Sequence, residues 1–234
     1  MSHPSRLGFL VSALLLMGAC ASAPRVSLTR VSEDQARAWL GRYCSLSGSA
    51  GSHGLTGELV VKSDSADFRG QFPAQVRFER NGNFVMEVTH LLGGTAVRLT
   101  SDSKTFNLEF PSKPARNRKG LTHYLGLEVP VLSQLFRGDL PCPSEAAKGG
   151  FRVSGHVIEV DSGEWTWTFM RGEAHGEVPV RVVLAPRVQG PGSGKVELEI
   201  VSWNKEEHFA EKVILRGPEG LLKWIWKNRR SGVQ

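Results

Sequence analysis

The 234-residue sequence has no hydrophobic run long enough to cross a membrane as a helix. The apolar stretch from Leu7 to Met17 has eleven residues, whereas a spanning helix needs roughly 18 or more. Arg6 precedes this stretch, and the small residues Gly18 and Ala19 follow it. This order is typical of a secretory signal peptide. We therefore assign residues 1–19 to a signal peptide and exclude them from the fold.

The motifs that commonly carry catalysis or nucleotide binding are also missing. There is no G-x-S-x-G sequence, and the seven histidines are scattered without H-x-H or H-E-x-x-H spacing. The glycine-rich segment 190–194 has no phosphate-loop lysine and precedes no expected helix. We interpret His53 and His90 as loop residues, and Asp102 and Asp161 as turn residues. The sequence predicts no enzyme, no metal site and no cofactor.

Cysteine is scarce, and the first of the three cysteines, Cys20, ends the signal peptide. Met17-Gly18-Ala19-Cys20 resembles the lipobox of bacterial lipoproteins, in which the cysteine is lipidated and becomes the mature N-terminus. The residue after Cys20 is Ala21 and not an acidic residue. For a lipoprotein of this kind, the resemblance implies sorting to the outer membrane, with residues 20–31 as a lipidated tether. The alternative is ordinary cleavage near Ala21 or Ala23, which leaves a soluble secreted protein.

Lipidation of Cys20 leaves an even pair, Cys44 and Cys142. An oxidising compartment favours a disulfide between them. Closing a loop of about 100 residues contributes about 4–5 kcal/mol in the chain-entropy model. The alternative is two separate buried thiols, which pack as small apolar side chains.

The positive charge of the chain is mild but clustered. Residues 1–19 contain one charged residue, Arg6, so their removal lowers the formal net charge from +6 to +5 and leaves 215 residues, enough for one domain. Basic residues concentrate at Lys113 to Lys119 and at Lys223 to Arg230. An exported protein does not meet nucleic acid, so the options are anionic lipid head groups, an acidic partner or a solvated loop.

Hydrophobic periodicity predicts one short helix followed by many strands. Ser32 and Gln35 form a capping-box pattern before a helix. From Leu55 apolar residues alternate with a period of two, and Asn81-Gly82 is typical of a tight hairpin with positive φ angles. The segment 121–137 is predicted as a second helix with Pro130 in its first turn and Gly138 at its end. We expect strands from Leu55 onward, among them 72–78, 84–88, 95–100, 105–110, 151–160, 165–169, 178–184, 195–202, 212–216 and 221–227.

About ten or eleven antiparallel strands form a sheet too large to stay flat. We therefore predict a mainly β (α+β) fold over residues 32–234, in which a single curved antiparallel sheet closes into a barrel or an incomplete barrel. The apolar strand faces carry unusually large side chains, which either line a cavity for an apolar ligand such as acyl chains or form a solid core. These candidate lining residues are Phe72, Phe78, Phe84, Phe106, Phe110, Trp165, Trp167, Phe169, Trp224 and Trp226.

Three segments in the same order carry a resemblance to a known family. Glu87 to Gly94 (EVTHLLGG) looks like a strand followed by a loop with a protruding apolar residue before glycine. Leu127 to Pro141 looks like a helix that ends in Gly and Leu-Pro, and Val213 to Trp226 like a closing hairpin with a Trp-bearing end. Behind a lipobox, this order resembles the LolB-like outer-membrane lipoproteins, the lipoprotein-localisation receptor family.

The resemblance implies an incomplete barrel closed by a few helices around an apolar cavity. It also implies a lipid-anchored monomer on the periplasmic face of the outer membrane, which takes the acyl chains of lipoproteins from a periplasmic carrier and assists their insertion. Leu91 and Leu92 are then the loop that contacts the membrane, although they can also pack beneath the barrel rim. The alternative function is a non-catalytic envelope lipoprotein that holds another lipid or a protein partner. An open apolar lumen favours the first function, and a packed interior favours the second.

Overall fold

The computed structural model describes residues 32–47, 54–102, 104–143, 150–172, 178–188 and 194–232. The predicted signal peptide, the tether with Cys20, and His53 lie outside these ranges. No helix among the described residues is long and apolar enough to span a membrane. The buried core runs from Ala36 to Trp226, so a chain that begins at Ser32 retains all of it.

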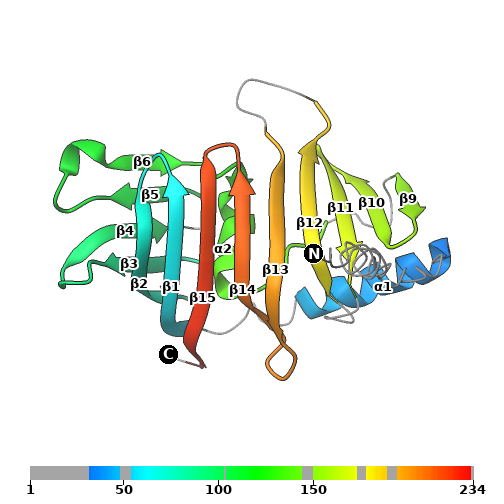
Figure 1. Cartoon of the computed structure of the whole chain (residues 1–234), viewed down its shortest axis with the longest axis horizontal. Coiled ribbons are helices and arrows are strands. Elements are labelled where there is room, and N and C mark those ends of the chain that lie inside the picture. The colour runs from blue at the N-terminus through cyan, green and yellow to red at the C-terminus, as the bar shows by residue number, and fades with distance from the viewer. Residues whose placement is uncertain are drawn as a thin grey trace, which may run out of the picture.

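Thirteen strands of the described residues form one antiparallel sheet (Figure 1). Six come before the second helix and seven after it. Those of the first half are β1 (Leu55–Ser65), β2 (Arg69–Phe78), β3 (Phe84–Thr89), β4 (Thr95–Ser101), β5 (Phe106–Glu109) and β6 (Arg118–Leu121). Those of the second half are β9 (Phe151–Ser154), β10 (Val157–Ser162), β11 (Trp165–Arg171), β12 (Pro179–Pro186), β13 (Val196–Asn204), β14 (Phe209–Gly217) and β15 (Gly220–Ser231).

The sheet is a meander whose two halves join in the middle. Each strand pairs with its neighbour in sequence, and β1 pairs with β15. The free edges are therefore β6 and β9, and the sheet curves without closing. The predicted fold class, an incomplete antiparallel barrel with few helices, is confirmed.

The strand count is higher than the expected ten or eleven. A turn at Gly155 (φ 59°) divides the expected strand 151–160 into β9 and β10. Part of the basic segment also pairs with β5 as strand β6, after a short 3-10 helix, η1 (Pro114–Arg116). Periodicity alone misses these short edge elements, because each has only a few residues of pattern.

The second helix, α2 (Val129–Arg137), begins eight residues later than expected. Leu125 and Gly126 have positive φ angles of 54° and 78°, and the chain reverses there into a small hairpin of β7 (His123–Tyr124) and β8 (Leu127–Glu128). Pro130 lies in the first turn of α2, and Gly138 ends it in the left-handed conformation, as predicted.

The first helix, α1 (Glu33–Ser47), begins with the predicted capping box. The Ser32 backbone N–H donates to Gln35 Oε1 (3.1 Å), and the Gln35 N–H donates to Ser32 Oγ (3.3 Å). Trp39 and Tyr43 then pack against Phe169 of β11, so α1 covers the second half of the sheet (Figure 1).

The hairpin at Asn81-Gly82 is looser than predicted. Of the two residues only Gly82 has a positive φ (87°), and the loop is closed by the Glu79 N–H donating to the Asn83 carbonyl (2.8 Å). The Asn81 side chain accepts a hydrogen bond from the Asn83 N–H (2.9 Å), which fixes the turn without a second left-handed residue.

Candidate functional site

The aromatic side chains predicted to line a cavity face the interior of the half-barrel. Phe72 and Trp165 are half-buried, and the other eight are buried. Phe84 contacts Phe78, and Phe136 of α2 lies between Phe84 and Trp224, with ring centroids 5.1 to 5.8 Å apart. These rings pack on one another and on α2, so α2 fills the space that the curved sheet encloses.

A small apolar cavity remains in the first half of the barrel. Its volume is about 20 Å³, close to the space of one water molecule and far below that of an acyl chain. None of the ten predicted aromatic residues borders it. Its lining is Val61, Phe68, Met86, Val88, Val97, Leu99, Leu108, Tyr124, Phe136 and Leu222.

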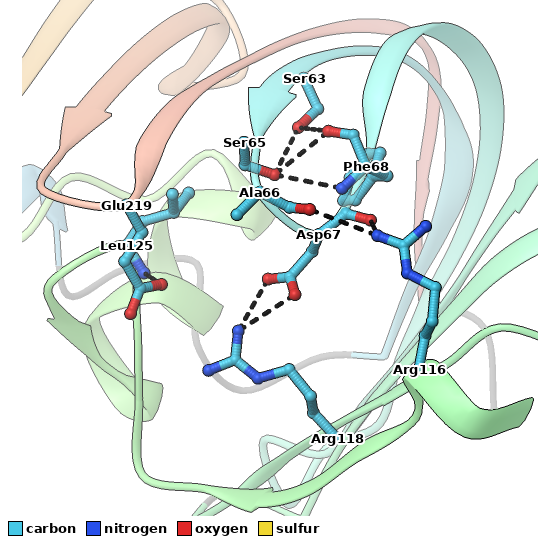
Figure 2. A network of polar contacts seen from close by, with 9 residues as sticks. All are labelled: Ser63, Ser65, Ala66, Asp67, Phe68, Arg116, Arg118, Leu125 and Glu219. Atoms are coloured by element: carbon cyan, nitrogen blue, oxygen red, sulfur yellow. Dashed lines mark hydrogen bonds and ion pairs between the residues drawn. The ribbon is translucent and has the colours of Figure 1, made fainter.

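Phe68 borders this cavity from the turn between β1 and β2. Its carbonyl oxygen accepts hydrogen bonds from the hydroxyls of Ser63 (2.9 Å) and Ser65 (3.2 Å), as Figure 2 shows. Both serines are buried, and their strand positions alternate with exposed residues. The Phe68 turn is therefore held by short-range polar contacts while its ring packs against the core.

Two arginines of the basic segment tie this turn to the β6 edge of the sheet. One guanidinium nitrogen of Arg118, Nη1, donates hydrogen bonds to both carboxylate oxygens of Asp67, at 3.1 Å to Oδ1 and 2.9 Å to Oδ2. Arg116 donates to the backbone carbonyls of Ala66 and Asp67, and its guanidinium lies over the Phe110 ring. We name Asp67, Arg116 and Arg118 the rim clamp (Figure 2).

A second polar contact joins the same end of the barrel. The Leu125 N–H, in the β7–β8 turn, donates to the Glu219 carboxylate (3.1 Å) from the β14–β15 turn. Tyr124, beside it, is buried at the cavity, and both this burial and the nearby Asp67 charge raise the pKa of its phenol. Four turns or loops thus meet at one end of the half-barrel, which we call the rim.

Leu91 and Leu92 lie in the β3–β4 turn, which the antiparallel meander places at the same strand ends as the β1–β2 turn of the rim. Their side chains are 84% and 101% exposed, so they do not pack beneath the barrel. Gly93 and Gly94 adopt positive φ angles of 92° and 81°, and the His90 N–H donates to the Gly94 carbonyl (3.0 Å). The tight turn leaves the two leucines, named here the leucine tip, projecting into solvent.

A disulfide between Cys44 and Cys142 joins α1 to the segment that follows α2, with a Cα–Cα distance of 5.4 Å. The Tyr43 hydroxyl donates to the Pro141 carbonyl (2.7 Å) next to it. Burial raises the pKa of Tyr43, so this phenol stays a donor. Both contacts hold α1 against the segment that follows α2.

Charged side chains are buried where α2 ends. The side chains of Arg137 and Asp139 are 7% and 5% exposed, with Arg137 Nε 3.6 Å from Asp139 Oδ2. Burial raises the pKa of Asp139 to about 6, although Arg137 and Arg229 oppose the shift. Arg229 lies over the Phe209 ring and pairs with Glu207 (3.6 Å).

Larger hollows occur on the outer face of the sheet. One open groove of about 460 Å³ crosses β15, β1, β2 and β3 and is lined by both signs of charge, including Glu58, Arg77, Glu87 and Arg230. It faces solvent along strands whose other face forms the core. Among the described residues, no group of three or more His, Cys, Asp or Glu side chains is arranged to hold a metal ion.

The sequence predicted the ten aromatic residues as a cavity lining and Leu91 and Leu92 as a membrane-contact loop, and it missed Phe68, Tyr124 and the rim clamp. No motif marks them, because Asp67 and Arg118 are separated by 51 residues and meet only when the sheet curves. The available signal was that residues 110–119 contain four basic residues and no acidic one, and it did not indicate that two of the arginines bind the β1–β2 turn.

No protein-family model matches the sequence, and no curated protein matches it. Solved structures with a similar course include a putative outer membrane lipoprotein-sorting protein domain from Vibrio parahaemolyticus, with 9% identity and a TM-score of 0.48 over 87% of this chain and 95% of that one. A LolA superfamily protein from Nitrosomonas europaea has 8% identity and a TM-score of 0.45 over 83% and 92%. The lipoprotein LppX of Mycobacterium tuberculosis has 10% identity and a TM-score of 0.34 over 84% and 95%. Likeness at this level carries no conclusion about function.

Proposed function

We propose that this protein binds an apolar chain, such as the acyl chains of lipoproteins, inside the half-barrel and exchanges it with a membrane at the rim. The observation that carries the proposal is the placement of the Phe68 turn. It separates the small apolar cavity from the rim, and the rim also carries the leucine tip.

The described conformation is the closed state of such a site. A cavity of about 20 Å³ holds no acyl chain, so binding requires space that the side chains at the rim now occupy. Phe68 is half-buried and comes from a turn, which costs less to move than a ring from a central strand. Release of the rim clamp therefore opens the interior toward the end that bears Leu91 and Leu92.

The remaining parts of the proposal come from the sequence. Cys20 carries the lipid anchor, the protein acts on the periplasmic face of the outer membrane, and a periplasmic carrier delivers the lipoprotein. The leucine tip contacts the bilayer during release. The function needs no cofactor and no covalent intermediate, because the acyl chain moves from one apolar environment, the protein interior, to another, the membrane.

The test is the binding of a fluorescent fatty-acid analogue to residues 32–234, with competition by unlabelled fatty acid. Asp67→Asn weakens the pair with Arg118 and should speed probe binding about three- to tenfold, as expected for the loss of roughly 1 kcal/mol from the closed state. Asp64→Asn is the matched control, because Asp64 is exposed, lies close to the same turn and forms its ion pair with exposed Arg69. Equal effects of the two variants would contradict the clamp as the gate.

A second candidate function is favoured by the packed interior. Since α2 and the aromatic rings leave little space, the fold can serve as a rigid envelope protein that holds a partner on its surface. This function predicts no competed probe binding in any variant, together with a normal unfolding transition. It also predicts that no lipid or lipopeptide is found by mass spectrometry of the purified protein.

A further inference from the structure

The loop of the basic segment, residues 110–117, lies at the same end of the molecule as the leucine tip, and Arg118 and Lys119 then run back beside β5 in strand β6. Strand β4 runs from the β3–β4 turn, and β5 returns beside it with Arg98 opposite Glu109. The residues that follow Glu109 therefore lie beside the start of β4, next to the turn that contains Leu91 and Leu92. Both loops project from the left side of the molecule in Figure 1.

Charge in this segment is of one sign. Residues 110–119 contain Lys113, Arg116, Arg118 and Lys119 and no carboxylate. Arg118 is neutralised by Asp67, whereas the contacts of Arg116 within the described ranges are with backbone carbonyls and a ring face. Lys113 and Lys119 are exposed, and no ion pair among the described residues involves them.

The turns at the opposite end of the barrel differ in the signs of their charges and in their exposed apolar side chains. Glu79 and Arg80 alternate in one, Asp102 and Lys104 in another, and Lys205 is followed by two glutamates in a third. The large apolar side chains exposed among the described residues are Leu91, Leu92 and Val188, so none lies in these three turns. The rim therefore combines an apolar tip with unpaired cations, and the opposite end does not.

We propose that the basic segment gives the rim a preference for bilayers that contain anionic phospholipid. This inference deepens the proposed function and rests on its membrane-facing rim. Two adjacent leucines on a tight turn insert into the apolar layer just below the head groups, while Lys113 and Arg116 of the neighbouring loop lie at the depth of the lipid phosphates, and Lys119 adds positive charge further along β6. A bilayer fits this arrangement better than an acidic protein, because the leucines form a convex tip with no surrounding apolar patch.

The experiment measures co-sedimentation of residues 32–234 with two kinds of vesicle, phosphatidylcholine alone and phosphatidylcholine mixed with phosphatidylglycerol. The unmodified chain should bind the mixed vesicles more tightly, and added salt should weaken this binding. The double variant Lys113→Gln/Lys119→Gln should bind the mixed vesicles roughly tenfold or more weakly, with little change on pure phosphatidylcholine.

Lys104→Gln/Lys205→Gln is the matched control, since it removes the same charge from exposed turns at the opposite end. It should bind like the unmodified chain. Equal weakening by both double variants would overturn the proposal, because net charge would then explain the binding. Absence of binding to both vesicles would also overturn it and leave an acidic protein surface as the partner.

The fatty-acid probe is measured without vesicles, so the two proposals fail separately. Loss of vesicle preference with intact probe binding would refute only the anionic-lipid site. Vesicle binding as expected, without competed probe binding, would refute only the acyl site in the interior.

Discussion

At the residue scale, Leu92 is a position where a substitution can change function without changing the stability of the fold. Its side chain is fully exposed, so a charge there costs no desolvation in the folded state. Leu108, in contrast, is 1% exposed and borders the small cavity. The two leucines therefore offer a matched pair for the same substitution.

Leu92→Glu should leave the free energy of unfolding within about 0.5 kcal/mol of the unmodified chain, because the site is on the surface. It should also reduce binding to vesicles, since a carboxylate does not enter the apolar layer. Leu108→Glu should cost several kcal/mol by burying a charge. Urea unfolding and co-sedimentation check both, and equal destabilisation by the two variants would place Leu92 in the core.

At the scale of elements, the end of α2 is joined to β14 and β15 by buried charges. The Ala210 N–H donates to the Gly138 carbonyl (2.8 Å), which places Asp139 near Arg229. The Asp139 carboxyl, with a pKa of about 6, changes charge near physiological pH, two residues after α2 ends. The stability of this joint should therefore depend on pH.

The sign follows from the raised pKa of Asp139. Because the folded chain holds this proton up to about pH 6 and the unfolded chain releases it near pH 4, its stabilising contribution is present at low pH and is lost as the pH rises through 6. The loss is at most about 3 kcal/mol. Urea unfolding at about pH 4 and about pH 7.5 should show the unmodified chain losing stability relative to Asp139→Asn.

Comparison with Asp139→Asn cancels the pH dependence of stability that comes from other carboxyl groups, because both chains contain them. Hydrogen bonds from Arg152 and Thr166 lower the pKa of Asp161, which gives the opposite trend with pH in both chains. A constant stability difference between the two chains across this range would contradict the assignment of a buried, proton-holding Asp139.

At the scale of the whole molecule, the disulfide joins the N-terminal helix to the middle of the chain. Cys44 and Cys142 are 98 residues apart, and the loop between them contains the first half of the sheet and α2. Constraining so long a loop removes many conformations from the unfolded chain. Its effect on stability should therefore exceed that of any single surface contact.

The double variant Cys44→Ala/Cys142→Ala should lose up to about 4–5 kcal/mol of unfolding free energy. Thermal unfolding with and without reductant measures this loss, and the reductant should lower the transition of the unmodified chain while leaving the variant unchanged. Two free thiols in the denatured, unreduced protein would show that the bond does not form in solution.

The sequence by itself determined the features that depend on neighbours along the chain. The capping box at Ser32 and Gln35, the alternation along β2 and β3, and the termini at Pro130 and Gly138 all follow from local rules. The alternating aromatic side chains also indicated which strand faces are buried. These features extend over a few residues, so one sequence is enough to see them.

Only the tertiary structure decided how the interior is filled and what lies at the rim. Whether Phe84 and Trp224 line a cavity or a core depends on α2, whose Phe136 lies between them. The contact of Arg118 with Asp67 depends on the curvature of the whole sheet, which brings its β6 edge to the β1–β2 turn. Such contacts join residues far apart in the chain, and periodicity carries no information about them because it reports the buried face and not the partner.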